Sequence, residues 1–250
     1  MIEKLKEITN RKSFHIVMII VIIFIILFVT GILILKYNVE GETNMPFRLT
    51  KISIISSSEG IDKETTETKW AFDVYQGNDI YLYIDKNKEY SKTEAIKSVN
   101  IENIKIETKN NEKINIYKPD NQEEKAIFKN KQENKVNSIE YLGDIESDLN
   151  NLKISNQGGL IAFRCSIDNI AEYKSNDEQI NHFELLKNAG IKNEDLQMKI
   201  YFDLIIKLEG GKEYKATINL DLPIDDVVGK GTTSTEITDS NNFIFKRVKN

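Results

Sequence analysis

The chain has 250 residues, 34 basic and 39 acidic, with a net charge of −5. One Cys and two His are too few for a zinc cage, and the lone Cys excludes an intramolecular disulfide. The nearly balanced composition gives no reason to expect a nucleic-acid partner, which favours a basic face. No residue pattern indicates a cofactor or a metal.

The N-terminal part contains one long apolar run. From Phe14 to Leu35, 18 of 22 residues are Ile, Leu, Phe or Val. A helix of that length reaches roughly 33 Å, against about 30 Å of bilayer hydrocarbon. The run exceeds the apolar region of a signal peptide and no small-residue cleavage site follows it. We therefore predict an uncleaved transmembrane helix over residues 14–36, in contact with membrane lipid.

The charges beside this run predict its orientation. The first thirteen residues contain four basic and two acidic side chains, whereas Glu40 and Glu42 follow the run. Basic residues favour the cytoplasmic side of a membrane. We expect a single-pass protein of the cell membrane, with residues 1–13 cytoplasmic, 37–46 a polar stalk, and 47–250 an extracytoplasmic domain.

The first half of that domain has the alternation of β-strands. Ile52 and Ile54 begin a strand that ends at 56–60, and a polar loop follows to Thr68. Residues 70–75 and 80–84 alternate on either side of Gln76-Gly77-Asn78-Asp79, which is typical turn chemistry and predicts a hairpin. Residues 96–106 and 114–117 supply more strand. The polar stretch 118–137 predicts a solvated loop or an edge hairpin.

The second half continues this pattern. We expect strands at 152–155 and 160–167, and Cys165 shares an apolar face with Ile161 and Phe163. Asn176 or Asp177 can cap one short helix that ends near Gly190. The clearest hairpin covers 198–222 around a Gly-Gly turn, and 243–248 can close a sheet edge.

These elements predict a mainly β fold: the transmembrane helix followed by an antiparallel β-sandwich ectodomain with one short helix. A single large sandwich over 47–250 is the first choice, because no Pro/Gly/Ser linker divides the chain. Two smaller sandwiches, divided near 118–137, are the alternative.

Catalytic sites can be tested against the few reactive residues. A cell-wall transpeptidase of the sortase type needs a thiolate, a base and an Arg in contact. Cys165 and Arg164 are adjacent and point to opposite faces of one strand, and His182 lies on the predicted helix. We therefore predict no catalytic residue and no enzyme activity. A carboxylate-pair hydrolase stays an alternative without a specific motif.

Tyr81 and Tyr83 are the only candidate ligand-binding residues. They lie on the strand face opposite Ile80, Leu82 and Ile84, so this strand is apolar on both faces. Either helices or loops cover the tyrosines, which is the favoured interpretation, or their rings are exposed to bind a sugar or a protein.

Several short segments carry a resemblance to known sequences. They are Met45-Pro46, Trp70 with Asn78-Asp79-Ile80-Tyr81, Asn156-Gln157-Gly158-Gly159, Phe202–Ile206, Leu220–Pro223 and Phe245-Lys246-Arg247. In these the chain resembles a group of uncharacterised single-pass envelope proteins of AT-rich Gram-positive bacteria. The resemblance implies placement in the envelope and brings no activity, cofactor or catalytic residue.

The sequence thus predicts a non-catalytic ectodomain that binds an envelope protein or a glycan, or scaffolds an assembly, at the cell surface. The alternatives are an envelope hydrolase that uses a carboxylate pair, and an accessory subunit of a membrane complex held through the transmembrane helix.

Overall fold

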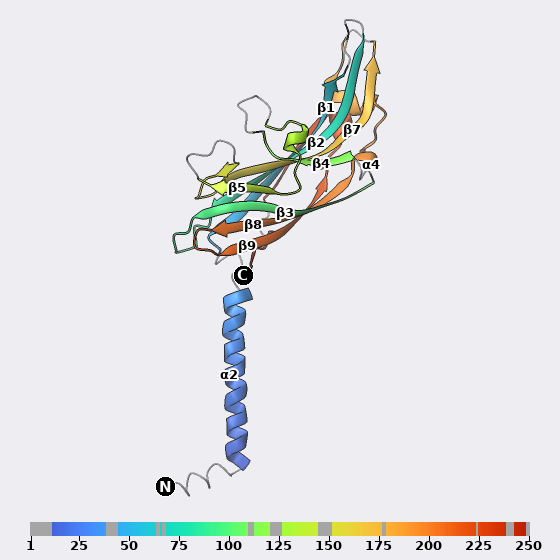
Figure 1. Cartoon of the computed structure of the whole chain (residues 1–250). Helices are drawn as coiled ribbons and strands as arrows, with labels where there is room; N and C mark the ends of the chain where they lie inside the picture. The colour runs from blue at the N-terminus through green and yellow to red at the C-terminus, as the bar shows by residue number, and fades with distance from the viewer. Residues whose placement is uncertain are drawn as a thin grey trace, which may run out of the picture.

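The computed structural model describes residues 12–38, 45–63, 66, 69–109, 113–120, 127–144, 152–176, 179–223, 225–238 and 243–248. Residues 1–11 of the predicted cytoplasmic segment 1–13, most of the stalk, and Asp177, one of the two proposed caps, lie outside these ranges. The fold is mainly β and begins with one long helix (Figure 1).

The helix α2 covers Lys12–Asn38. Its stretch His15–Leu33 is long and apolar enough to cross a membrane, and none of that stretch is buried against the rest of the chain. In Figure 1 α2 extends away from one end of the β-rich part. After α2 the described chain resumes at Met45, whose side chain is fully buried.

The described strands form two sheets. The first sheet has the order β10-β1-β2-β7-β4 and the second the order β11-β9-β8-β3-β5-β6. All neighbouring strands are antiparallel except β5 and β6, which are parallel. The first sheet contains β1 (Phe47–Asp62), β2 (Trp70–Lys86), β4 (Ile114–Tyr117), β7 (Gly159–Ser175) and β10 (Thr232–Ile237). The second contains β3 (Ile96–Thr108), β5 (Ile139–Gly143), β6 (Lys153–Ile154), β8 (Met198–Leu208), β9 (Glu213–Leu222) and β11 (Lys246–Arg247).

One hydrophobic core receives side chains from both sheets. The ring of Phe163 on β7 meets the ring of Phe202 on β8 edge to face, with centroids 5.2 Å apart. Cys165 also reaches across, with its Sγ 3.4 Å from Sδ of Met198. The predicted inward face of Ile161, Phe163 and Cys165 is confirmed, since all three are buried.

Tyr141 on β5 joins the sheets at an edge. Its hydroxyl donates to the carbonyl of Ala162 (2.6 Å) and accepts from the amide of Ala162 (3.1 Å). Ala162 precedes the residues of β7 that pair with β4. The Tyr141 hydroxyl therefore satisfies the amide and carbonyl of Ala162, which a longer β4 would otherwise bond. Burial raises the pKa of Tyr141, which keeps the hydroxyl protonated and able to donate.

The predicted turn at Gln76-Gly77-Asn78-Asp79 is wrong, because β2 runs without interruption through it. Gln76 and Asn78 are buried in the sheet and their amide groups bond one another at 2.9 and 3.0 Å. Asn78 also accepts from the hydroxyl of Ser56 (2.7 Å) and donates to the carbonyl of Cys165 (3.3 Å). These partners satisfy the buried amides, and β1 likewise continues to Asp62 instead of ending near Gly60.

The helical content beyond α2 also differs from the expectation of one helix. Within the described ranges the chain forms α3 (Leu185–Asn188), α4 (Asn193–Leu196) and α5 (Val227–Lys230), each of one turn, and the 3₁₀ turns η3 (Gln132–Asn134) and η4 (His182–Glu184). The predicted helix begins later than expected, at η4, where the Asn181 side chain accepts from the amide of Phe183. Gly190 does take the positive φ expected after its end.

The hairpin predicted over 198–222 is confirmed as β8 and β9. Gly211, at φ 80°, donates to the carbonyl of Leu208 and reverses the chain. The predicted strand at 243–248 shortens to Lys246–Arg247, which pairs with β9.

A bulge in β3 changes which side chains face the core. Asn103 takes φ 54°, and the pairing with β8 shifts between Glu102 and Lys105. After the bulge Ile104 and Ile106 face the core side, whereas strict alternation from Ile101 would turn them outward. The Asp203 carboxylate holds the bulge by accepting from Nδ2 of Asn103 (2.9 Å).

Asp203 also accepts from Oγ1 of Thr217 (2.6 Å) and from Nζ of Lys215 (3.3 Å). Burial opposes its charge, but these hydrogen bonds outweigh burial and lower the pKa of Asp203. A lowered folded-state pKa stabilises the fold fully above the unfolded pKa of about 3.9, and the contribution is lost as the pH falls through the folded pKa.

Asp203→Asn is therefore expected to lose about 1.5–3 kcal/mol of unfolding free energy at pH 7. The difference from the wild type should stay constant from pH 7 to 5 and shrink below pH 4. Urea unfolding of both proteins across this pH range measures it. A difference that grows on acidification would contradict the assigned direction.

Candidate functional site

Tyr81 and Tyr83 lie on the outer face of the first sheet, on β2, and both are half-buried. The Tyr81 ring meets the ring of Phe128 edge to face, at 6.4 Å between centroids. Nζ of Lys51 lies 4.1 Å from the centroid of Tyr83. The tyrosines are thus partly covered, each by one neighbour.

A shallow open hollow of about 350 Å³ includes both rings, and we call it the tyrosine hollow. Beside the rings lie Ile55 and Leu160, which are 37% and 47% exposed. Polar groups form the rest of the rim. The lining consists of Ser53, Ile54, Ile55, Tyr81, Tyr83, Leu160, Ser234, Thr235 and Glu236.

The segment 127–137 borders this hollow, and the expectation that all of 118–137 is solvated is wrong for part of it. Phe128 is only 5% exposed, because its ring lies on the sheet with the guanidinium carbon of Arg164 5.3 Å from its centroid. Lys129 pairs with Asp120 at 3.3 Å, and both side chains are largely shielded. Residues 121–126 lie outside the described part of the chain.

Arg164 is a buried cation at the centre of this face. It donates to both carboxylate oxygens of Asp79 (2.5 and 3.1 Å), to Glu59 (2.8 and 3.0 Å) and to Oδ1 of Asn130 (3.2 Å). Burial opposes the charge, but the hydrogen bonds and charges of Asp79 and Glu59 outweigh it and raise the pKa of Arg164. The cation is therefore permanent and ties β1, β2, β7 and the segment 127–137 together.

Asp168 on β7 forms a second polar centre beside the first. Its carboxylate accepts from the Tyr117 hydroxyl, from Nδ2 of Asn115 (2.7 Å) and Asn130 (3.2 Å), and from Oγ of Ser166 (2.9 Å). Burial and the bond to Asp168 raise the pKa of Tyr117. These donors occupy the acceptor positions of the Asp168 carboxylate, so the role of Asp168 is to hold β4 and Asn130 in place.

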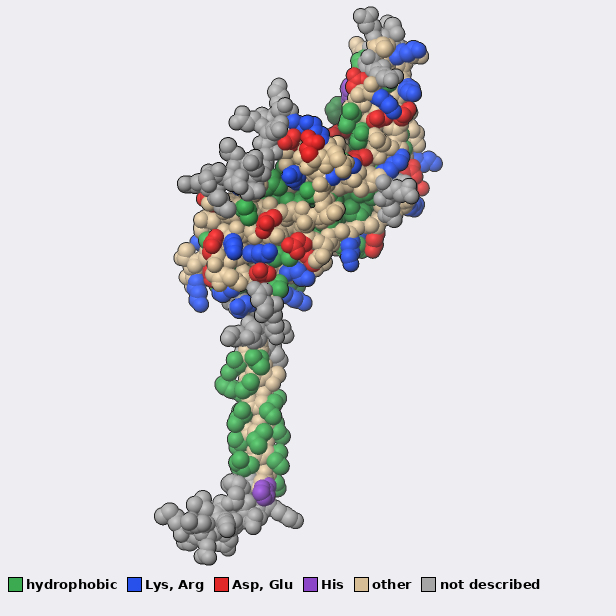
Figure 2. Space-filling model, viewed as in Figure 1, with side chains coloured by type: hydrophobic (Ala, Val, Ile, Leu, Met, Phe, Trp, Pro, Cys, Tyr) green, Lys and Arg blue, Asp and Glu red, His purple; other side chains and the backbone are tan. Residues whose placement is uncertain are grey.

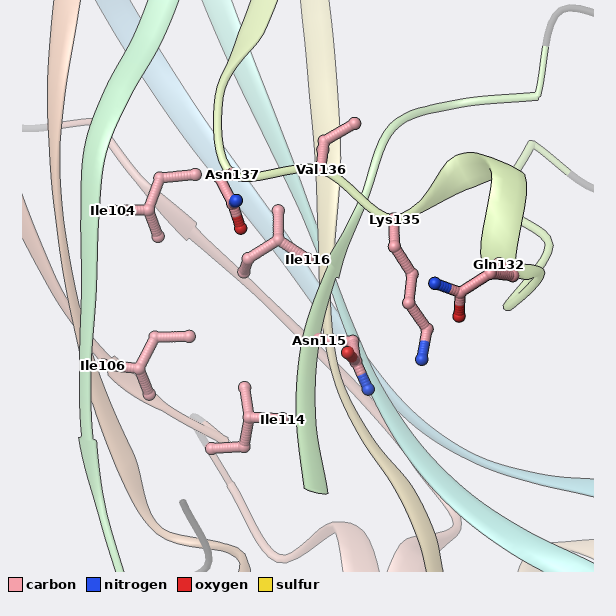
Figure 3. A pocket seen from close by; sticks show the side chains of 9 residues that line it. All are labelled: Ile104, Ile106, Ile114, Asn115, Ile116, Gln132, Lys135, Val136 and Asn137. Atoms are coloured by element: carbon pink, nitrogen blue, oxygen red, sulfur yellow. The ribbon is translucent and has the colours of Figure 1, made fainter. Parts of the chain in front are cut away.

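An open cavity of about 590 Å³, with isoleucine side chains on its floor and polar groups around them, lies on the other side of this network, and we call it the β3–β4 groove (Figure 3). Ile104 and Ile106 point from β3 toward Ile114 and Ile116 on β4. Val136, Asn137, Asn115, Lys135 and Gln132 complete the lining.

Both walls of the groove are edges of sheets. β5 pairs with β3 only at residues 98–101, so among the described strands the part of β3 beyond the bulge pairs with β8 alone. Residues 135 and 136 occupy part of the outer edge of β4. Lys135 forms an isolated β-bridge with Tyr117, and the Val136 amide donates to the Ile116 carbonyl (2.9 Å). The groove therefore combines a floor of isoleucine side chains with one backbone edge, that of β3 beyond the bulge, which can accept a further strand.

The structure places Cys165, Arg164 and His182 in different surroundings. Cys165 is fully buried, and burial raises the pKa of its thiol to about 12. Arg164 points to the opposite face, and His182 lies in η4 with its ring 5.8 Å from that of Phe72. In the part of the chain that the structure describes, no group of three His, Cys, Asp or Glu could hold a metal ion.

The hollow beside the ends of β3 and β9 contains two carboxylates, Glu107 and Asp221. Lys199 on β8 lies between them in the sheet, because it is opposite Glu107 of β3 on one side and opposite Asp221 of β9 on the other. Its Nζ is 3.6 Å from Asp221. These two carboxylates, with an ammonium beside them, are a candidate pair for the hydrolase alternative.

No protein-family model, curated protein or solved structure matches this chain. Sequence reasoning named the tyrosines but missed the β3–β4 groove. One signal was present: Ile104 and Ile106 are out of phase with Ile101, which indicates a bulge between them.

Proposed function

We propose that this protein is a single-pass, membrane-anchored β-sandwich that holds an extended segment of another envelope protein in its β3–β4 groove, without catalysis. The groove is the observation that carries the proposal, because its isoleucine floor lies beside the part of the β3 edge that no described strand pairs with except β8.

The membrane placement rests on α2 and the charges around it. The unburied apolar stretch His15–Leu33 supports a membrane span. The basic residues before it support a cytoplasmic N-terminus and an extracytoplasmic domain at the cell membrane. The resemblance to Gram-positive envelope proteins agrees with this placement. The core shared by the two sheets supports a sandwich.

The chemistry of the groove favours an extended peptide. Free backbone groups of an edge strand bind an added strand by main-chain hydrogen bonds, and its alternate side chains enter the apolar floor. Ile104, Ile106 and Ile114 offer half-buried surface for those side chains. We therefore expect a segment with apolar residues at every second position.

Photo-crosslinking in cells tests the proposal. A benzoylphenylalanine at Ile106 on β3 or at Ile114 on β4 should capture the same partner segment, since the two positions face one another. The same group at Ile61, an exposed position on β1, is the matched control and should not capture it. A synthetic peptide of the captured segment then gives the affinity for the purified full chain.

Two variants decide the outcome. Ile104→Lys places a charge on the groove floor, and Asn137→Trp fills the groove from an exposed position without altering the core. Each should weaken peptide binding at least about tenfold, or 1.4 kcal/mol. Equal binding by Asn137→Trp, or capture of unrelated segments from the two walls, would contradict the proposal.

The tyrosine hollow supports a second candidate, a glycan or protein ligand of Tyr81 and Tyr83. The hydroxyls of Ser53, Ser234 and Thr235 beside aromatic rings favour a sugar. Loss of binding to isolated cell-wall glycan in Tyr83→Ala, with the groove variants unaffected, would establish it.

A further inference from the structure

We propose that a basic surface on the second sheet binds the phosphate headgroups of anionic phospholipids in the bilayer that α2 spans. The surface consists of Lys215, Lys246 and Arg247 around Ile244. This proposal rests on the proposed membrane anchoring.

The position of the surface is the first argument. β11 pairs with β9 at the edge of the second sheet, with Lys246 opposite Lys215. β11 also lies in contact with α2. Figure 1 shows β9, beside this edge of the sheet, at the end of the domain nearest to α2. In a domain anchored by α2 this edge of the sheet therefore faces the lipid.

The shape and polarity of the surface are the second argument. It forms an open depression of about 560 Å³, lined by Lys215, Thr217, Ile244, Lys246, Arg247 and Val248. Ile244 is 58% exposed, whereas Phe243 and Phe245 on either side of it are buried. The two phenylalanines fix the segment in the core and turn Ile244 outward, where it can enter the interfacial layer of a bilayer.

Charge is the third argument. Three cations and no acid line the depression. Lys215 reaches Asp203 at 3.3 Å, but Asp203 is buried beneath it and the lysine is still 44% exposed. Figure 2 shows Lys and Arg side chains along the underside of the domain near α2. The net negative chain thus presents a locally positive face to the bilayer, which complements anionic headgroups.

The test uses the full chain in nanodiscs, either of phosphatidylcholine alone or of an equal mixture with phosphatidylglycerol. Amine acylation is followed at individual lysines by mass spectrometry. Lys246 should react about fivefold more slowly in the anionic nanodiscs, and high salt should abolish the difference. Lys174, an exposed lysine at the far end of β7, is the internal control and should react equally in both.

A pair of variants separates headgroup binding from simple crowding by α2. Lys246→Gln/Arg247→Gln should remove most of the lipid-dependent protection of Lys215, whereas the matched Lys63→Gln/Lys174→Gln should leave it unchanged. Equal Lys246 reactivity in both lipid mixtures overturns the proposal. Protection by soluble polyphosphate as strong as that by the anionic bilayer overturns it too, in favour of an anionic polymer.

A separate measurement tests whether α2 anchors the chain in the membrane. Extraction of membranes with alkaline carbonate releases the chain if α2 does not span the bilayer. Retention of the chain together with unchanged Lys246 reactivity rejects headgroup binding alone.

Discussion

Replacement of Arg164 by Met is expected to lower the free energy of unfolding by about 3–5 kcal/mol. The substitution leaves the largely buried carboxylate of Asp79 without its partner, and it also removes donors to Glu59 and Asn130. Burial of an unpaired charge is the dominant cost, because the apolar stem of Met replaces most of the lost packing. Urea unfolding of the full chain in detergent micelles measures the change.

Two further variants test whether burial of an unpaired charge causes the loss. Arg164→Met/Asp79→Leu removes the orphaned carboxylate and should recover much of the loss, since an apolar pair can replace a buried ion pair at little cost. Lys174→Met breaks an exposed pair with Glu172 and should change stability by less than about 1 kcal/mol. A loss under 1 kcal/mol for Arg164→Met would show that the network does not hold this face of the sheet.

Replacement of the neighbouring residue, Phe163, by Ala is expected to cost a similar 3–5 kcal/mol for a different reason. Its ring is fully buried between the sheets and packs edge to face on Phe202. The substitution leaves a cavity that the two rigid sheets cannot close. The loss should show no dependence on salt or pH, because no charge is involved.

Phe163→Leu should lose only part of that stability, since most of the volume is kept. Phe183→Ala is the matched control for loss of an aromatic ring, because Phe183 is exposed in η4, and it should stay within about 0.5 kcal/mol of the wild type. Equal losses at positions 163 and 183 would contradict a core that joins the two sheets.

The elements that sequence predicted well depend on local patterns. The alternation over 198–222 and its Gly-Gly turn predict β8 and β9, because neighbouring strands and a short turn need no distant partner. The apolar face of Ile161, Phe163 and Cys165 follows from period-two alternation in the same way.

The elements that sequence missed depend on distant partners. Gln76 and Asn78 have the composition of a turn, but Ser56 and the Cys165 carbonyl satisfy Asn78 inside the sheet. Local propensity cannot include such partners. The segment 127–137 is likewise polar in composition, yet Asn130 bonds to Arg164 and Asp168, which lie more than thirty residues further along the chain.

The candidate site was predictable only in part. Alternation placed Tyr81 and Tyr83 on the outer face of the sheet, as the structure has them. The β3–β4 groove depends on how two sheets end beside one another, and no single segment carries that information. Its walls come from β3, β4 and the segment 127–137, which are brought together by Asp168 and the bulge at Asn103.

The short connection between α2 and the domain limits where the proposed partner can be. Only six residues separate Asn38 from Met45, which is the first residue buried in the core. Even a fully extended chain of that length covers no more than about 25 Å. For a domain anchored as proposed, this short connection keeps the start of the folded part close to the lipid surface, so the proposed partner has to come near the membrane to be bound.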